Sequence, residues 1–478
     1  MRALILGLPK GFWSEDWSRN FVNALPMGVF AIANHCNDWG HDVRIVNAAV
    51  CGSRERAIET ILRRLDETRA AVVGIPLHWH LAGYDVLRAA EFLKKARPAL
   101  RIVLGGLTAS VYPREILERF PAVDAVIAGD GEVPFCALLD ALEGRTGEPD
   151  LSGVPNLHWR KHGAIRDNGL RYVASSEQLS ALDFSPRAGV CPPGDYANGL
   201  VLHEAIQGLS PDPSLQPLDR RMFFMNIGRG CSYTCAYCGG SRTSHLRYTG
   251  RDEVTVRSVT SVVTDFERCH AAGFRRFHIC FDPAFPNKQA YFEALFDGVR
   301  RTIGTGSDLV FESYGLPSRA LAEAAAEAFS SVGLIVSPCF FEPAIRRVCK
   351  GYAFSDEEME ICLLELATID RCQAFVYFAV TPREDWSDQL LAGRIERLVG
   401  LRRRTGASIS VMPVFAEPGS PWVALPDGSP ERRFSLSFDD FFELWRQPLD
   451  GWNDRLTGVT GIDRVMARFQ EVLGPAEA

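Results

Sequence analysis

Three cysteines lie close together in the segment NIGRGCSYTCAYCGGS, at Cys231, Cys235 and Cys238. Thiolates are soft ligands that bind zinc or iron-sulfur clusters. Structural zinc sites usually have a closed set of four ligands, and no second C-x2-C pair lies nearby in the sequence. An odd set of three thiols therefore predicts a metal site with one position open for a substrate or cofactor.

The spacing resembles the C-x3-C-x2-C motif of the radical S-adenosylmethionine superfamily, including the aromatic Tyr237 before the last cysteine. The resemblance implies one four-iron four-sulfur cluster, in which three irons bind the cysteines and the fourth chelates S-adenosylmethionine, with Tyr237 against the adenine. It also implies cleavage of S-adenosylmethionine to a 5'-deoxyadenosyl radical, with electrons from an external donor such as flavodoxin or ferredoxin. The alternative is a three-cysteine zinc site completed by a distant histidine such as His245.

Further segments resemble the cofactor pocket of the same superfamily. FDPAFPNK at 281–288 is similar to its D-D-x-F-x-x-N segment, which implies that Asp282 lines the cofactor pocket. Glu312 and Ser313, at the end of DLVFESYG, stand where relatives contact the ribose. An acid that caps the next helix and polar residues that cap a loop are the alternative interpretations. EPGSPW at 417–422 resembles the turn that ends the sixth strand.

The segment 337–352 departs from the superfamily pattern. Pro338 and Cys339 stand where relatives usually carry a Glu-Ser pair, although residues 350–352 are similar to theirs. The matching cofactor contact is therefore not expected here. No cysteine follows Cys372, so we expect a single cluster.

The N-terminal 145 residues alternate strand-like and helix-like segments, which is typical of a doubly wound, Rossmann-like parallel sheet. Ligands of such sheets bind at the carboxyl ends of the strands. The expected strands are 2–8, 42–48, 70–77, 101–106 and 124–132.

This order resembles the cobalamin-binding domain that precedes the radical domain in one branch of the superfamily. The residues that match its nucleotide-tail contacts are Gly105, Gly106 and Thr108, and Gly129 and Gly131 match a second turn. The resemblance implies a cobalamin cofactor. An empty sheet and another kind of nucleotide site are the alternatives.

Many cobalamin domains supply an axial histidine from D-x-H-x-x-G after the first strand, but this chain has GLPKGFW there. His80 begins a similar fragment, HLAG, on the loop after the third strand instead. We therefore expect cobalamin to be held without that histidine. Trp79 is the residue that we expect against the lower face of the corrin, with His78 and His80 packing rather than coordinating.

Strand and helix patterns return from residue 222 and predict a partial (β/α)6 barrel. The aromatic segment 438–452 predicts a small C-terminal helical element in which Phe441 and Trp445 pack. The expected domains are 1–145 (cobalamin-binding), 146–215 (connector), 216–425 (radical barrel) and 426–478 (cap).

The composition is that of an ordinary globular protein, with 46% hydrophobic and 23% charged residues in a chain of 478. The net charge of -7 offers no general attraction to nucleic acid or anionic membranes. The apolar run at the N-terminus is too short for a signal peptide or a membrane span. We expect a cytoplasmic protein without nucleic-acid or membrane partners.

Cobalamin beside a radical-generating cluster implies methyl transfer to an unactivated carbon of a small-molecule or natural-product intermediate. A radical enzyme that catalyses a rearrangement, cyclisation or oxidation without methyl transfer is the alternative. A non-catalytic α/β protein that binds zinc is the third hypothesis. The sequence identifies neither the substrate nor any proton-transfer residue.

Overall fold

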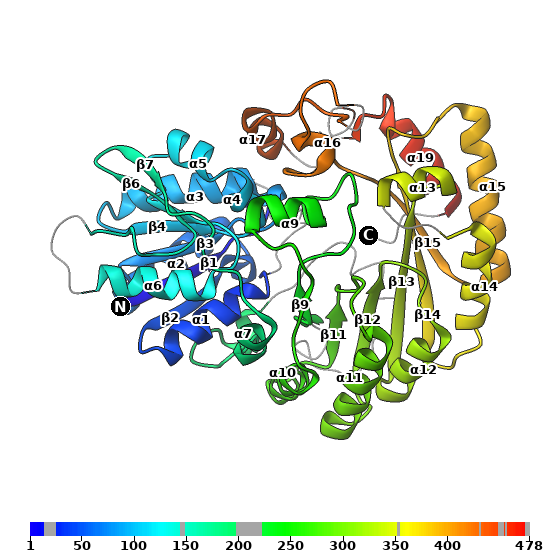
Figure 1. Cartoon of the computed structure of the whole chain (residues 1–478), viewed down its shortest axis with the longest axis horizontal. Helices are drawn as coiled ribbons and strands as arrows, with labels where there is room; N and C mark the ends of the chain where they lie inside the picture. Colours follow the sequence, from blue (N-terminus) through cyan, green and yellow to red (C-terminus); the bar gives the residue numbers. More distant parts are fainter. Residues whose placement is uncertain are drawn as a thin grey trace. The chain divides into compact units, whose positions relative to one another are not determined.

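The computed structural model describes residues 1–13, 25–143, 149–196, 222–350, 354–429, 432–447, 454 and 457–473. The chain divides into two compact units, each built on its own sheet (Figure 1). The N-terminal unit comprises residues 1–200, 244–252 and 436–448, and the barrel unit comprises residues 201–243, 253–435 and 449–478.

The N-terminal unit contains a seven-stranded sheet of order β2-β1-β3-β4-β5-β6-β7. The first five strands along the chain are parallel, and β6 and β7 are antiparallel. The strand order reverses between β1 and β3, which is where such sheets bind their ligands. The strands are β1 Arg2–Gly7, β2 Asp42–Asn47, β3 Val72–Pro76, β4 Arg101–Gly105, β5 Ala125–Ile127, β6 Leu157–Lys161 and β7 Ala164–Asp167.

Helices cover this sheet because each presents a stripe of apolar residues. In α2, Ala57, Ile61 and Leu65 are buried at a spacing of four residues, and the Ser53 side chain caps the helix by accepting from the Arg56 N–H. The helices of this part are α1 Gly28–Asp38, η2 Ala48–Cys51, α2 Arg54–Thr68, η3 His80–Ala82, α3 Gly83–Ala96, α4 Leu107–Val111, α5 Pro113–Arg119, α6 Glu132–Leu142, α7 Ser176–Ala181 and η4 Pro193–Asp195.

A distant segment, α17 (Phe438–Arg446), completes the N-terminal unit. It packs against α3 and η3. The Phe438 and Tyr112 ring centroids lie 5.1 Å apart. A Cβ atom on Gly83 would lie 2.2 Å from the Trp445 ring, so helix α17 packs as closely as a glycine permits. Phe441 and Trp445 are fully buried, as expected.

A hairpin lies within the segment that the sequence predicts to be a connector. Strands β6 and β7 pair with each other, and β6 extends the sheet beside β5. The turn uses His162 at φ 50° and Gly163 at φ 77°, which is the left-handed pair that two-residue hairpins need. The prediction missed it because His-Gly is not one of the usual signals for this turn.

The barrel unit contains a six-stranded, fully parallel sheet of order β15-β14-β13-β12-β11-β8. Met222, Val310 and Ile335 form a buried cluster with Phe375 packed against it. Strands β9 (Gly228–Arg229) and β10 (Thr255–Val256) form a short antiparallel pair, and both lie between β8 and β11 along the chain. The strands are β8 Met222–Phe224, β11 Arg276–Ile279, β12 Asp308–Ser313, β13 Ser331–Cys339, β14 Cys372–Val380 and β15 Ser408–Pro413.

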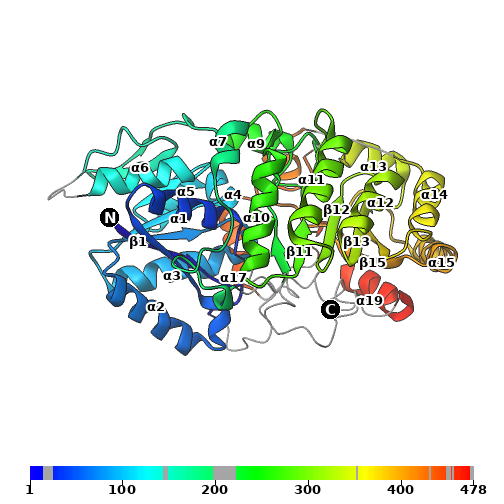
Figure 2. The same ribbon diagram turned by 90° about the horizontal axis from the view of Figure 1, so that it is seen from below.

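Helices connect consecutive strands of this sheet, and Figure 2 shows α10, α11 and α12 side by side along one face of it. No helix in the described part of the chain is both long and apolar enough to cross a membrane. The helices are α9 Arg242–Thr249, most of which belongs to the N-terminal unit, α10 Val259–Ala271, α11 Lys288–Ile303, α12 Arg319–Ala328, α13 Pro343–Lys350, α14 Asp356–Leu366, α15 Asp388–Thr405, α16 Pro421–Ala424 and α19 Ile462–Leu473.

The predicted fold class is confirmed: a doubly wound parallel sheet precedes a six-stranded partial barrel, and helices end the chain. The expected domain boundaries stay a prediction. Residues 197–215 of the expected connector, residues 351–352 and residues 448–452 lie outside the described residues.

Candidate functional site

The three cysteines of the motif lie on one loop of the barrel unit, after β8 and β9. Each is partly exposed. Two of the sulfur atoms accept backbone hydrogen bonds: the Tyr233 N–H donates to Cys231 Sγ at 3.4 Å, and the Gly240 N–H donates to Cys238 Sγ at 3.3 Å. Backbone N–H groups that point at sulfur are the donors that stabilise a cluster thiolate.

Backbone hydrogen bonds attach this loop to two segments that follow it far along the chain. The Ala236 N–H donates to the Cys349 carbonyl on α13 at 2.7 Å. Its carbonyl accepts from the Trp422 N–H at 2.9 Å, and the Tyr237 carbonyl accepts from the Glu417 N–H at 3.2 Å. The loop is therefore fixed at both sides by the barrel unit.

Burial raises the pKa of all three thiols: that of Cys235 to about 12, that of Cys238 well above its ordinary value, and that of Cys231 to a smaller extent. The backbone donors lower the pKa of Cys231 and Cys238 and oppose this effect. A bound cation removes such protons outright. The thiols are thus stable as a protonated set and become thiolates when metal binds.

The spacing of the three sulfur atoms favours a cluster over one zinc ion. Three thiolates on a single zinc at about 2.3 Å would lie roughly 4 Å from one another. In the described part of the chain, one group of three potential ligand atoms lies within 4.8 Å of one another, and it does not include these cysteines. The arrangement therefore suits a cluster, in which each cysteine binds a different iron.

Tyr237 lies beside aromatic residues and beside the departure noted at Cys339. Its ring centroid is 5.8 Å from that of Phe340 and 5.9 Å from that of Trp422. Its hydroxyl lies 3.4 Å from Cys339 Sγ. Cys339 has φ 59° where β13 shifts register, a strained conformation for a residue with a side chain. The position of the missing Glu-Ser pair thus adjoins the aromatic residue of the motif.

The Asp282 carboxylate is buried and fully occupied by neighbouring groups. One oxygen accepts from Lys288 Nζ at 2.7 Å, and the other accepts from Ser313 Oγ at 3.2 Å and from the Tyr314 N–H at 3.0 Å. Burial raises the pKa of Asp282, and Lys288 opposes that shift. Asp282 and Ser313 therefore tie the ends of β11 and β12 together.

Glu312 lies at the end of β12 with one third of its side chain exposed, and its Oε1 is 2.9 Å from His278 Nε2. The His278 ring packs against that of Phe224 at a tilt of 31°, with the ring centroids 4.7 Å apart. Of the two polar residues that end β12, Glu312 is the one with accessible surface. The sequence pattern did not point to His278, because one histidine in an apolar strand carries no signal of its own.

In the N-terminal unit, the loop after β4 packs directly on the loop after β3. Gly106 has φ 100°, and a Cβ atom there would lie 2.8 Å from the backbone of His78. Thr108 is buried, and its Oγ1 donates to the His78 carbonyl at 2.9 Å. Gly106 and Thr108 therefore fix the His78 loop at the carboxyl end of the sheet.

The other glycines of the pattern differ in what surrounds them. Gly129 has φ 74°, and a Cβ atom there would lie 3.2 Å from the Thr249 carbonyl oxygen. A Cβ atom on Gly131 would lie 3.0 Å from Ile32. A Cβ atom on Gly105 would lie 3.7 Å from the Ile127 carbonyl oxygen, which is an ordinary van der Waals contact. Packing within the protein therefore does not require a glycine at the carboxyl end of β4, whereas the close approach of a large cofactor to the backbone would.

His80 is buried, and its Nδ1 accepts from Trp445 Nε1 at 3.1 Å. Burial lowers the pKa of His80 to about 3, so the ring is neutral and occupied by packing, as expected. Trp79 is half-buried, and His78 is exposed. Their rings meet edge to face at 5.3 Å. The Trp79 side chain is therefore partly accessible at the surface of this loop.

Glu417 is a site residue that the sequence reading placed only in a turn. Its Oε2 accepts from the Gly239 N–H at 2.6 Å, directly after Cys238. Burial raises the pKa of Glu417. An acid inside the otherwise apolar run VFAEPGSPW was the available signal, because a buried carboxylate needs a donor.

Residues 22–139 match the protein family described as the B12 binding domain. The match covers the loops that carry Trp79, Gly105, Gly106, Thr108, Gly129 and Gly131. The cobalamin cofactor expected for this unit is thereby confirmed.

Two curated relatives are similar over about half of the chain. An uncharacterized methyltransferase of Pyrococcus horikoshii is 24% identical over 240 residues, which are 50% of this chain and 45% of the relative. The anaerobic magnesium-protoporphyrin IX monomethyl ester cyclase of Rubrivivax gelatinosus is 22% identical over 232 residues, which are 46% of this chain and 35% of the relative. The chain spans less than half the length of either relative.

A solved structure shares the fold over most of the chain. It is the radical S-adenosylmethionine methyltransferase TsrM of Kitasatospora setae, with tryptophan substrate and a SAM analog bound. The TM-score is 0.63 at 17% identity, over 88% of this chain and 74% of that one. A B12 binding domain thus precedes a partial barrel that shares its fold with a radical S-adenosylmethionine methyltransferase, and the first strand of this barrel leads into the C-x3-C-x2-C motif.

Proposed function

We propose that the chain is a cobalamin-dependent radical S-adenosylmethionine methyltransferase that acts on an unactivated carbon of a small-molecule or natural-product intermediate. The observation that carries the proposal is the three-thiol loop after the first barrel strand, in one chain with a B12 binding domain. Methyltransferases among the similar proteins support the same activity.

When bound, the cluster supplies the electron that cleaves S-adenosylmethionine to a 5'-deoxyadenosyl radical, and cobalamin supplies the methyl group. Cys231, Cys235 and Cys238 hold three irons. Glu417 and the backbone of α13 keep the cysteine loop in place through the contacts to Gly239 and Ala236. Because the set offers three protein thiolates for four irons, one iron remains available to S-adenosylmethionine.

The S-adenosylmethionine pocket is proposed to include Tyr237, Glu312 and Ser313. Glu312 is one-third exposed and is oriented by His278, so its second oxygen is available to a ribose hydroxyl. Ser313 and Asp282 are hydrogen-bonded to each other, and we assign them the positioning of the β12 end that carries Glu312. Tyr237 supplies an aromatic surface for the adenine.

Cobalamin is proposed to bind at the carboxyl ends of β3, β4 and β5. Gly105 is proposed to let the cofactor approach the backbone, whereas Gly106 and Thr108 hold the His78 loop in place. Gly129 and Gly131 shape the turn after β5, and Trp79 is proposed to lie against the lower face of the corrin. Since His80 is bonded to Trp445, no axial ligand is assigned to it.

The remaining partners are proposals as well. The substrate is a small molecule, and a flavodoxin or ferredoxin donates the electrons. We place the protein in the cytoplasm, without nucleic-acid or membrane partners, on its net charge of -7 and the finding that no described helix could span a membrane.

The test combines cofactor content with the fate of a labelled methyl group. After anaerobic reconstitution we expect about four irons per chain and one cobalamin. With S-adenosylmethionine labelled on its methyl carbon, we expect 5'-deoxyadenosine and transfer of the label to a carbon of the product. The C231A/C235A/C238A variant, which lacks the cluster ligands, is the control and should form neither.

A radical reaction without methyl transfer is the second candidate, because the cyclase of Rubrivivax gelatinosus is among the relatives. It predicts 5'-deoxyadenosine in step with substrate consumption but no label in the product. Zinc without iron in the purified chain would instead contradict both radical proposals.

A further inference from the structure

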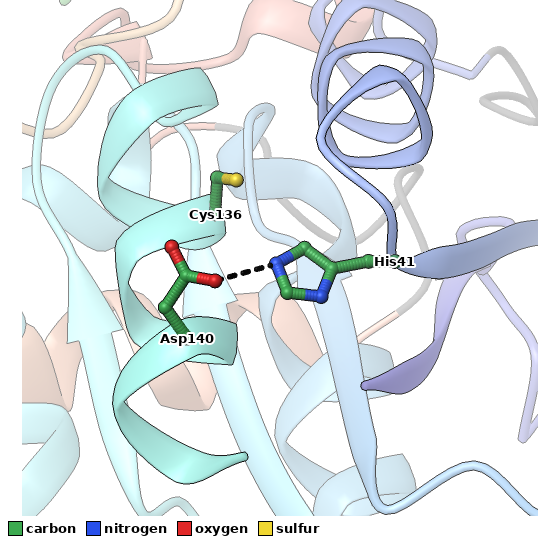
Figure 3. Close-up of side chains that lie close together, drawn as sticks. All are labelled: His41, Cys136 and Asp140. Atoms are coloured by element: carbon green, nitrogen blue, oxygen red, sulfur yellow. Dashed lines mark ion pairs between the residues drawn. The ribbon is translucent and has the colours of Figure 1, made fainter.

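A second group of metal-binding side chains lies in the N-terminal unit. His41, Cys136 and Asp140 each offer a ligand atom, and these atoms all lie within 4.8 Å of one another. Figure 3 shows Cys136 and Asp140 one turn apart on α6 and His41 facing them from the start of β2. His41 Nε2 is 3.2 Å from Asp140 Oδ1. Two elements far apart in sequence thus bring three donor types together.

Cys36, on α1, adds a fourth donor to this group. Its thiol lies next to that of Cys136, although it is outside the group whose ligand atoms all lie within 4.8 Å of one another. Cys36 and His41 are five residues apart, and Cys136 and Asp140 are four apart, so each element contributes a short-spaced pair of the kind that zinc sites use. We define the α1–α6 ligand set as Cys36, His41, Cys136 and Asp140.

The set is mostly shielded from water. Cys36 is 0% exposed, Cys136 5% and His41 7%, whereas Asp140 lies at the edge. His41 Nε2 is buried, and the atom that it faces is the Asp140 carboxylate oxygen. The other ring nitrogen lies 3.1 Å from the Met1 amine.

We propose that the α1–α6 ligand set binds one Zn²⁺ ion. Two thiolates, an imidazole and a carboxylate are the donors that tetrahedral zinc takes in proteins. Zinc would join His41 Nε2 to the Asp140 carboxylate, which lies 3.2 Å from it.

The role of this ion is structural. With Cys36 as the fourth ligand, the protein would fill all four coordination positions, which is the feature that separates structural from catalytic zinc sites. His41 precedes β2, and so lies at the amino edge of the parallel sheet, whereas the cobalamin loops follow the carboxyl ends of the strands. Zinc would join α1 to α6, and its binding is independent of methyl transfer.

Cobalt substitution in the full chain tests the proposal. The C231A/C235A/C238A background removes the motif thiols, so that any remaining thiolate-bound metal reports on other cysteines. Under anaerobic conditions we expect one Co²⁺ per chain with a thiolate-to-cobalt absorption and the visible bands of a tetrahedral ion. Zn²⁺ should displace it. One zinc per chain is likewise expected in the purified wild-type protein by mass spectrometry.

Variants of the set supply the controls. H41A and D140N in the same background should weaken Co²⁺ binding at least tenfold, and C136S should abolish the thiolate absorption. C191S is the matched control, since Cys191 is a fully buried free cysteine of the same unit outside the set, and it should bind as the background does. Retained cobalamin binding verifies that each variant is folded. Absence of the cobalt bands, bands unchanged in H41A, or a Cys36–Cys136 disulfide in metal-free purified protein would each overturn the proposal.

Discussion

At the scale of single residues, the site is defined by buried acidic groups whose oxygens accept hydrogen bonds from specific neighbours. Asp282 is occupied by Lys288, Ser313 and the Tyr314 N–H, and Glu417 is bonded to the Gly239 N–H. Such hydrogen bonds fix the loops of the proposed cofactor sites, and losing one partner leaves the other buried and unsatisfied.

The Glu417 contact gives the first prediction. In E417A, the Gly239 N–H beside Cys238 loses its acceptor, which should cost about 1.5–3 kcal/mol of loop stability and lower the iron retained after gel filtration. E417Q keeps an acceptor oxygen and should retain more iron than E417A. Iron per chain and the cluster electron-paramagnetic-resonance signal measure the difference, and equal iron loss in both variants would contradict the role assigned to this hydrogen bond.

His80 gives a prediction about pH. Its pKa is about 3 in the folded chain, against an ordinary value of 6.5. Between these values the unfolded chain binds a proton that the folded chain does not, so the free energy of unfolding falls as the pH falls from 6.5 towards 3. The slope reaches about 1.4 kcal/mol per pH unit for one such group.

The H80Q variant removes this titration and keeps an acceptor for Trp445 Nε1. Urea unfolding at pH 7 and pH 5 should therefore show a smaller loss of stability for H80Q than for the wild type. If both lose the same amount, His80 is already protonated in the fold or equally neutral after unfolding.

Residues with a chemical role could be predicted when their signal lies within a short stretch of sequence, and not when it depends on a contact between distant segments. The cysteines are identified by a spacing within eight residues, and His80 was correctly expected to pack. Glu417 meets Gly239 across 178 residues, and the His278–Glu312 contact joins two strands. Only the sheet register brings these pairs together, and a sequence without its fold does not specify them.

At the scale of elements, the loops after β3 and β4 form one packed unit. Gly106 and Thr108 hold the backbone of His78, and η3 with His80 follows at once. The strands themselves were predicted within a few residues because parallel strands are continuous apolar runs. The β6–β7 hairpin was missed because its turn, with His162 and Gly163 at positive φ, has no common sequence signal.

Two neighbouring glycines separate a folding role from a cofactor role. G106A should destabilise the fold by several kcal/mol for two reasons. Alanine would have to adopt a φ of 100°, and its Cβ atom would lie 2.8 Å from the His78 backbone. G105A should fold like the wild type, since its nearest neighbour would be 3.7 Å away, but bind cobalamin less tightly. Thermal unfolding and cobalamin titration measure the two effects. Normal cobalamin affinity in G105A would remove this glycine from the proposed site.

At the scale of the whole molecule, each unit has its own sheet and its own core. The C231A/C235A/C238A variant should therefore lose iron while it keeps cobalamin in full. Anaerobic absorption spectra and metal analysis of the reconstituted variant measure both. A parallel loss of cobalamin would show that the cysteine loop is needed for the fold of the other unit.

The division into units was only partly predictable. Composition and element order separate a doubly wound sheet from a partial barrel, but they do not show that residues 244–252 and 436–448 belong to the N-terminal unit. The return of α17 depends on surface complementarity, in which the Trp445 ring meets the hydrogen-only side of Gly83. The sequence of α17 shows that this helix has an apolar face. Which helices that face packs against is determined only by the three-dimensional surface.

The place of α17 bears on the order in which the protein is made. A ribosome adds about 5–20 residues per second, and residues 436–448 are synthesised well after residue 200. From residue 200 to the end of α17 at Arg446 there are 246 residues, or roughly 12–50 s of translation at that speed. During this interval the surface around Gly83, Tyr112 and Phe120 that α17 later covers is exposed on the nascent chain, which makes it a natural binding site for a chaperone. The same interleaving means that recombination could not exchange the cobalamin-binding part as one contiguous cassette without leaving its last helix behind.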